Sequence, residues 1–156
     1  MLEAPRFNLS DMPPEAYRHL LEMEALIAKH IEPALYHLIK LRASQINGCA
    51  FCLAMHTEQA LQHGEKPERM TSLDAWQESP LYSDKERAAL AWTDDLTLIA
   101  DSGASREAFE GLRPHFKDEE IPWLILAVVQ INNWNRIAIA TRAQYKSGMF
   151  DHRRQE

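Results

Sequence analysis

The two cysteines of the chain are close together and are followed by a histidine. They are Cys49 and Cys52, and His56 comes four residues after the second. A Cys-x-x-Cys pair is typical of a dithiol that opens and closes as a disulfide, or of half a metal site. In a reducing compartment such a pair indicates catalytic, redox-sensing or metal chemistry rather than a structural disulfide.

The spacing places all three side chains on one face of a helix that begins near Cys49. Residues three and four apart are neighbours on a helix surface, which pairs Cys49 with Cys52 and Cys52 with His56. The free N–H groups and positive end of the helix dipole favour a thiolate on Cys49. The imidazole of His56 favours ionisation of Cys52 instead, so these residues alone leave open which sulfur is the nucleophile.

A further histidine is expected near this pair. Asn47-Gly48 is a turn signal, and an antiparallel helix hairpin around it places His37 at the height of His56. The two rings could form a proton relay. Two other interpretations stay open: a zinc site of the Cys₂His₂ type formed by Cys49, Cys52, His56 and His37, and buried, inert thiols.

The elements that must position these residues are helical, because hydrophobic periodicity near 3.6 dominates the chain. We predict an all-α domain of six to eight helices, with residues 1–12 extended. Proline, serine and glycine signals mark the helix ends. The expected helices span about 13–30, 33–46, 49–63, 67–73, 83–102, 105–116 and 119–147.

Composition narrows the function classes. The chain has 156 residues, which fits one domain, and its formal net charge of -6 argues against nucleic-acid binding. No signal-peptide pattern opens the sequence, and the longest apolar run, Ile121–Ile131, is too short for a membrane span. A cytoplasmic protein without membrane contacts is therefore expected. The last helix is apolar around most of its circumference, which favours association of subunits.

The segment from Leu38 to Cys52, followed by His56, resembles the AhpD-like alkylhydroperoxidase core within the carboxymuconolactone decarboxylase superfamily. Supporting similarity lies at Trp76 with Ser79-Pro80-Leu81, at Glu86–Trp92, and at Ile131–Arg136. The resemblance covers most of residues 33–146. We therefore expect a single AhpD-like domain over 1–156, with its core at 33–146, an N-terminal arm at 1–12 and a polar tail at 148–156.

The resemblance implies a function. It implies homo-oligomers, commonly trimers or hexamers, that reduce hydroperoxides through thiols without a bound cofactor. Cys52 would attack the peroxide, Cys49 would close the disulfide, and His56 would be the relay histidine. An external dithiol, lipoyl or thioredoxin-like, would reduce the pair again.

Two positions depart from the family pattern. His37 stands where family members often carry a glutamate, and Phe51 stands where the best-known peroxidases have a histidine. An imidazole can also move protons, so His37 keeps a place in the predicted site. The alternative to an enzyme is a redox sensor in which disulfide formation changes oligomer packing.

Overall fold

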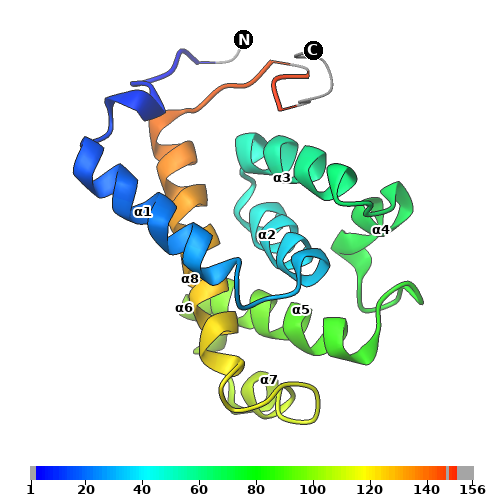
Figure 1. Ribbon diagram of the computed structural model, residues 1–156. Helices are drawn as coiled ribbons and strands as arrows, with labels where there is room; N and C mark the ends of the chain where they lie inside the picture. The colour runs from blue at the N-terminus through cyan, green and yellow to red at the C-terminus, as the bar shows by residue number, and fades with distance from the viewer. Residues whose placement is uncertain (1–2, 147, 151–156) are drawn as a thin grey trace.

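The computed structural model describes residues 3–146 and 148–150, where the chain forms helices and connecting segments without a β-strand (Figure 1). The predicted all-α fold is thereby confirmed. Two short 3₁₀ helices, Leu9–Asp11 and Leu73–Ala75, accompany the α-helices. The α-helices of the described residues are α1 (Pro14–Ile27), α2 (Pro33–Asn47), α3 (Ala50–Gln62), α4 (Pro67–Thr71), α5 (Asp84–Thr97), α6 (Ile99–Ser102), α7 (Arg106–Glu110) and α8 (Ile121–Thr141).

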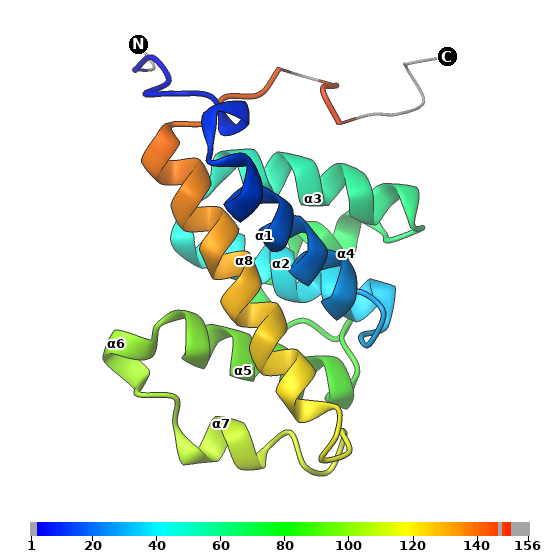
Figure 2. The ribbon, with the colours of Figure 1, turned by 60° about the vertical axis from the view of Figure 1, so that its left-hand side comes forward.

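Helix α2 lies at the centre of the fold and packs against α3, α5 and α8 (Figure 1). Helix α1 runs alongside α8 (Figure 2). Nine of the 15 residues of α2 are buried, including the polar residues His37, Lys40 and Ser44. Buried polar groups are costly unless they are hydrogen-bonded, so these three side chains must find partners inside the fold.

Several helix ends fall where the sequence marks them. Pro33 begins α2, and Gly48 ends it in the left-handed conformation with φ 66°, which suits a residue without a Cβ. The hydroxyl oxygens of Ser83 and Ser105 accept main-chain N–H groups at the starts of α5 and α7. Glu86 completes a capping box with Ser83, as the sequence predicts.

The predicted single helix over 83–102 is divided at Leu98 into α5 and α6. Leu98 leaves helical geometry with φ -94° and ψ 37°, and α6 follows as a separate turn. The carboxylate of Asp95 accepts the main-chain N–H of Ser105. This bond joins the start of α7 to α5. Helix α7 is likewise shorter than the predicted 105–116.

The last helix was predicted to reach 147 but ends at Thr141, with Arg142 left-handed. The N-terminal arm takes up its final carbonyls: the main-chain N–H of Arg6 donates to Thr141 O at 2.9 Å, and Arg6 Nη1 donates to Ala140 O at 3.1 Å. The arm itself is not wholly extended, because Leu9–Asp11 is a 3₁₀ helix. Of the predicted polar tail, residues 151–156 lie outside the described ranges.

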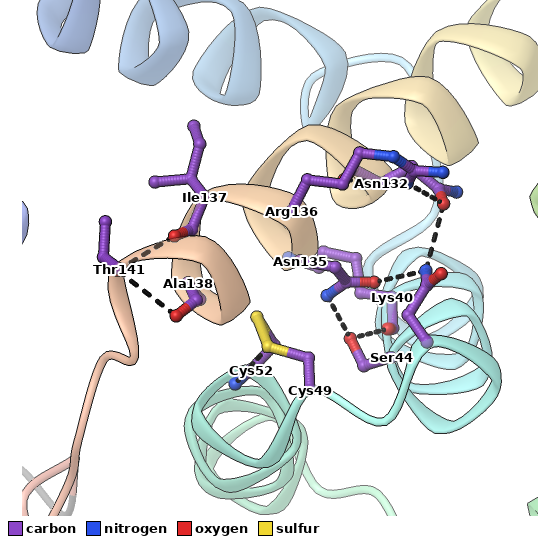
Figure 3. The surroundings of a disulfide bond; sticks show 11 residues. Lys40, Ser44, Cys49, Cys52, Asn132, Asn135, Arg136, Ile137, Ala138 and Thr141 are labelled. Atoms are coloured by element: carbon purple, nitrogen blue, oxygen red, sulfur yellow. Dashed lines mark hydrogen bonds between the residues drawn. A yellow bond between two sulfur atoms is a disulfide. The ribbon is translucent and has the colours of Figure 1, made fainter. Parts of the chain in front are cut away.

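Amide side chains tie the end of α2 to α8 (Figure 3). Asn135, which is fully buried, donates from Nδ2 to Ser44 Oγ and accepts from Asn47 Nδ2, each at 2.9 Å. Asn47 Nδ2 also donates to Asn132 Oδ1 at 3.0 Å. This network holds the residues just before Cys49 in place against α8.

Substituting Asn135→Ala is expected to lower the free energy of unfolding by about 2 kcal/mol, because it leaves buried partners unsatisfied. Urea unfolding of the purified protein measures this. Asn133→Ala is the matched control, since Asn133 is exposed on the same helix, and a change below about 0.5 kcal/mol is expected there. Equal effects of the two substitutions would contradict the role of the network.

In the residues that the structure describes, no helix has the length and apolarity needed to cross a bilayer.

Candidate active site

The two cysteines lie together at the start of α3. They are joined as a disulfide with Cα atoms 5.4 Å apart, and both side chains are buried. Cys49 is the N-cap of α3, and its sulfur accepts the N–H of Cys52 at 3.3 Å. The disulfide points from α3 towards Ala138 of α8 (Figure 3). Cys52 lies in the first turn of α3, whereas Cys49, predicted in that turn, precedes it as the N-cap with extended backbone.

A cavity of about 730 Å³ opens beside the disulfide, and Cys52, but not Cys49, is part of its wall. Residues of α1, α2, α3 and α8 enclose it. Apolar and aromatic side chains form much of the wall, among them Leu9, Tyr17, Leu21, Phe51, Met55 and Trp134. A mostly apolar cavity with a few polar groups is the usual form of a small-molecule site.

His56 lies in this wall one turn beyond Cys52 and is buried. Its Nδ1 is 2.9 Å from Gln59 Oε1, whereas its Nε2 has no partner among the described residues. Burial and, secondarily, the positive charge of Lys40 lower the pKa of His56 to about 3. The ring is therefore neutral at pH 7.

The sequence predicts that His37 of α2 lies at the height of His56, and both residues line the same cavity. Burial lowers the pKa of His37 to about 4, with smaller effects from Lys40 and His63. Its direct partner is His63, whose Nδ1 lies 3.1 Å from His37 Nε2. His63 was not among the predicted site residues. Its position seven residues after His56, two turns along the same helix face, could have indicated it.

A buried ionic network in the wall was also missed. Glu24 of α1 accepts hydrogen bonds from Tyr36 at 2.8 Å, Trp134 at 3.2 Å and Lys40 at 3.3 Å. Lys40 is buried on α2, and burial lowers its pKa while Glu24 opposes that shift. No motif in the sequence relates these residues, because the contact depends on how α1 crosses α2 and α8.

The buried histidines make stability depend on pH. An unfolded histidine has a pKa near 6.5, whereas His37 and His56 have pKa values of about 4 and about 3 in the folded protein. Between these values the unfolded chain binds more protons than the folded one. The free energy of unfolding is therefore expected to be highest above pH 6.5 and to fall as pH drops, by up to about 1.4 kcal/mol per pH unit for each histidine.

Urea unfolding between pH 7 and pH 5, above the range in which most carboxylates titrate, measures this fall. His56→Gln is expected to show a shallower fall, and His19→Gln, exposed on α1, an unchanged one. Stability that stays flat over this interval in the original protein would contradict the burial of neutral rings.

The structure also shows the surroundings of Phe51, which departs from the family pattern. Phe51 lines the cavity and packs edge-on against Phe150, with ring centroids 5.3 Å apart, so the position is apolar in this chain. The zinc interpretation can also be compared with the structure. Among the described residues, no group of three histidine, cysteine or acidic side chains is arranged to hold a metal ion. The zinc interpretation therefore lacks a ligand set in this part of the chain.

Known proteins are similar to this chain over most of its length. The carboxymuconolactone decarboxylase family matches residues 14–95. The uncharacterised protein YdfG of Bacillus subtilis (strain 168) is 39% identical over 136 residues, which is 86% of this chain and 92% of YdfG. ATU0492 of Agrobacterium tumefaciens, a protein of unknown function with a suggested role as the antioxidant defence protein AhpD, is 43% identical with a TM-score of 0.88. The match covers 92% of this chain and 99% of that one.

A more distant solved structure has the same fold. The debrominase Bmp8 in complex with 2,3,4-tribromopyrrole is 20% identical, with a TM-score of 0.77, over 91% of this chain and 76% of that one. At this identity the likeness concerns the helical architecture alone.

Proposed function

Because the chain belongs to the carboxymuconolactone decarboxylase family and has the AhpD-like helical fold, we propose that it is a thiol-dependent peroxidase that reduces organic hydroperoxides through Cys49 and Cys52. One observation carries the proposal. Cys52, half of a pair that can exchange two electrons, lines an apolar cavity together with the buried His56.

The position of the cavity favours Cys52 as the attacking thiol. Its thiolate attacks the terminal oxygen of R–O–O–H, the O–O bond breaks, and the products are a sulfenic acid and, after protonation, R–OH. Cys49 lies behind it as the N-cap of α3, where its thiol can displace water from the sulfenic acid and close the disulfide. An external dithiol, lipoyl or thioredoxin-like, then reduces the disulfide and completes the cycle.

Two features support ionisation of Cys52. The sulfurs lie at the N-terminus of a 13-residue helix, where the main-chain dipole favours negative charge. Lys40 adds a buried positive charge to the same cavity. The low pKa of His56 belongs to the disulfide state; an anionic sulfur beside the ring raises it, so His56 can share the thiol proton once the pair is reduced.

The apolar wall favours an organic hydroperoxide over hydrogen peroxide, because the organic group removes more apolar surface from water on binding. The proposal includes the homo-oligomer, trimer or hexamer, and the cytoplasmic location that the family and the sequence suggest.

A turnover assay tests the proposal. The reduced protein is mixed with one equivalent of cumene hydroperoxide, and the thiols are counted by intact-mass measurement after alkylation. We expect loss of both thiols and release of one equivalent of alcohol. Excess hydroperoxide with dihydrolipoamide should then give sustained consumption.

A redox sensor behaves differently in the same assay. It would oxidise once, stoichiometrically, and stop even when the dithiol is supplied. Recovery of two unmodified thiols after exposure to hydroperoxide would overturn both the peroxidase and the sensor.

A further inference from the structure

Aromatic side chains from distant parts of the chain line the cavity beside Cys52. Phe51 comes from α3 and Phe150 from the segment after α8, and both belong to the wall. The other aromatic residues of the wall are Tyr17, Tyr36 and Trp134. Aromatic rings offer a large apolar area and attract other rings in edge-to-face or offset contacts. A wall of this composition favours a ligand that itself carries an aromatic ring.

Phe51 connects this wall to the sulfurs. It precedes Cys52 in the chain, and its side chain packs against the buried group formed by Cys49, Cys52 and Ala138. It also meets Phe150 edge-on, with ring centroids 5.3 Å apart and an interplanar angle of 85°. A ligand ring in contact with Phe51 and Phe150 is therefore held next to Cys52.

Helix α3 holds Phe150 in this position. The segment after α8 passes over α3 (Figure 2), and Gln62 Nε2 donates a hydrogen bond to the main-chain oxygen of Phe150 at 3.1 Å. Both Phe51 and Phe150 are only partly buried. In an edge-to-face pair at least one ring has faces that its partner does not cover. Aromatic surface in this pair is therefore left for a ligand.

A second edge-to-face pair lines the same cavity. Tyr17 of α1 and Trp134 of α8 have ring centroids 5.7 Å apart and an interplanar angle of 77°. The indole N–H of Trp134 donates to Glu24 at 3.2 Å, so the polar atom of this ring is already paired. The pair adds aromatic surface from two further helices to the wall.

From these contacts we infer that the cavity is specific for hydroperoxides that carry an aromatic ring, and that Phe51 and Phe150 bind this ring. The inference rests on the proposed peroxidase function, which supplies the reacting –O–O–H group. The cavity volume of about 730 Å³ is within the usual range of small-molecule sites, so it has room for the ring as well. Phe51 and Phe150 contact the organic group and determine specificity.

Two alcohols of matched shape test the inference without redox chemistry. 2-Phenyl-2-propanol is the alcohol formed from cumene hydroperoxide, and 2-cyclohexyl-2-propanol has the same carbon skeleton with a saturated ring. Transfer out of water favours the more apolar cyclohexyl compound, so tighter binding of the phenyl compound reports on contacts between rings. Calorimetric titration of the disulfide form is expected to give a Kd about fivefold lower for the phenyl alcohol.

Substitution by leucine removes a ring but keeps an apolar side chain. Phe150→Leu retains the main-chain hydrogen bond to Gln62 and is expected to bind both alcohols with Kd values within about twofold of each other. Phe51→Leu should lose the preference in the same way. Phe109→Leu is the matched control, because Phe109 meets Trp92 edge-on at 5.7 Å but lies outside the cavity wall. This variant should keep the preference for the phenyl alcohol.

The results for the inference and for the peroxidase are separate. Equal or tighter binding of the cyclohexyl alcohol, a preference that survives in Phe150→Leu or in Phe51→Leu, or no binding of either alcohol overturns the inference. None of these measurements involves the thiols, so the peroxidase is then judged by the turnover assay alone. A phenyl preference in a protein that does not consume hydroperoxide would leave the aromatic site in place and show that the proposed function is wrong.

Discussion

Replacing Cys52 with serine is expected to lower the rate of hydroperoxide consumption by about 10³-fold or more, because serine lacks an ionisable nucleophile of comparable strength. Cys52 is the sulfur in the cavity wall, so its loss removes the first step. Stopped-flow mixing of the reduced variant with cumene hydroperoxide measures the rate.

Cys49→Ser provides the matched comparison. Cys49 is as deeply buried but does not line the cavity. This variant should react once at nearly the original rate and stop as a sulfenic acid on Cys52, which dimedone traps and mass spectrometry detects. If Cys52→Ser formed the sulfenic acid at full rate while Cys49→Ser did not, the roles of the two sulfurs would be reversed.

The largest effect on stability is expected from Glu24→Ala. The substitution removes three hydrogen-bond acceptor contacts and leaves the charge of Lys40 buried without a partner. Breaking a buried ion pair from one side costs about 3–5 kcal/mol. Since Glu24 keeps some access to solvent, we expect the free energy of unfolding to fall by about 3 kcal/mol in urea titrations.

Two further variants check the cause. Glu22→Ala, on the same helix but exposed and paired with Arg18 at the surface, should change stability by less than about 1 kcal/mol. Adding Lys40→Met to Glu24→Ala should recover part of the loss, because no unpaired charge then remains. A double variant that is as unstable as the sum of the single variants would show that Lys40 and Glu24 are not coupled.

The helix ends that depend on a few neighbouring residues were predictable from the sequence. Pro33, Gly48 and Ser83 act on their own helix turns, and their effects appear where expected. The shared cavity of His37 and His56 was also predictable, because one tight turn joins their helices. These inferences need no knowledge of how distant segments pack.

Long-range contacts explain what the sequence did not reveal. The end of α8 depends on Arg6, which lies at the opposite end of the chain and takes the carbonyls of the last turn. Glu24 meets Lys40 only because α1 packs against α8 in a position from which its side chain reaches α2. Such crossings follow from the packing of whole helices, which the local pattern does not specify. His63 is different, since its helical phase with His56 was available in the sequence.

The connection between α2 and α3 restricts how this scaffold can be altered. Only Gly48 and Cys49 separate Asn47 from Ala50, so the start of α3 is fixed closely to the end of α2. Inserting or deleting a single residue there would change the position of α3 relative to α2 and move Cys52 out of the cavity wall, even if every side chain were retained. Substitutions in this connection should therefore be tolerated far better than changes in its length. Variants with a longer or shorter connection are expected to fold but to be inactive.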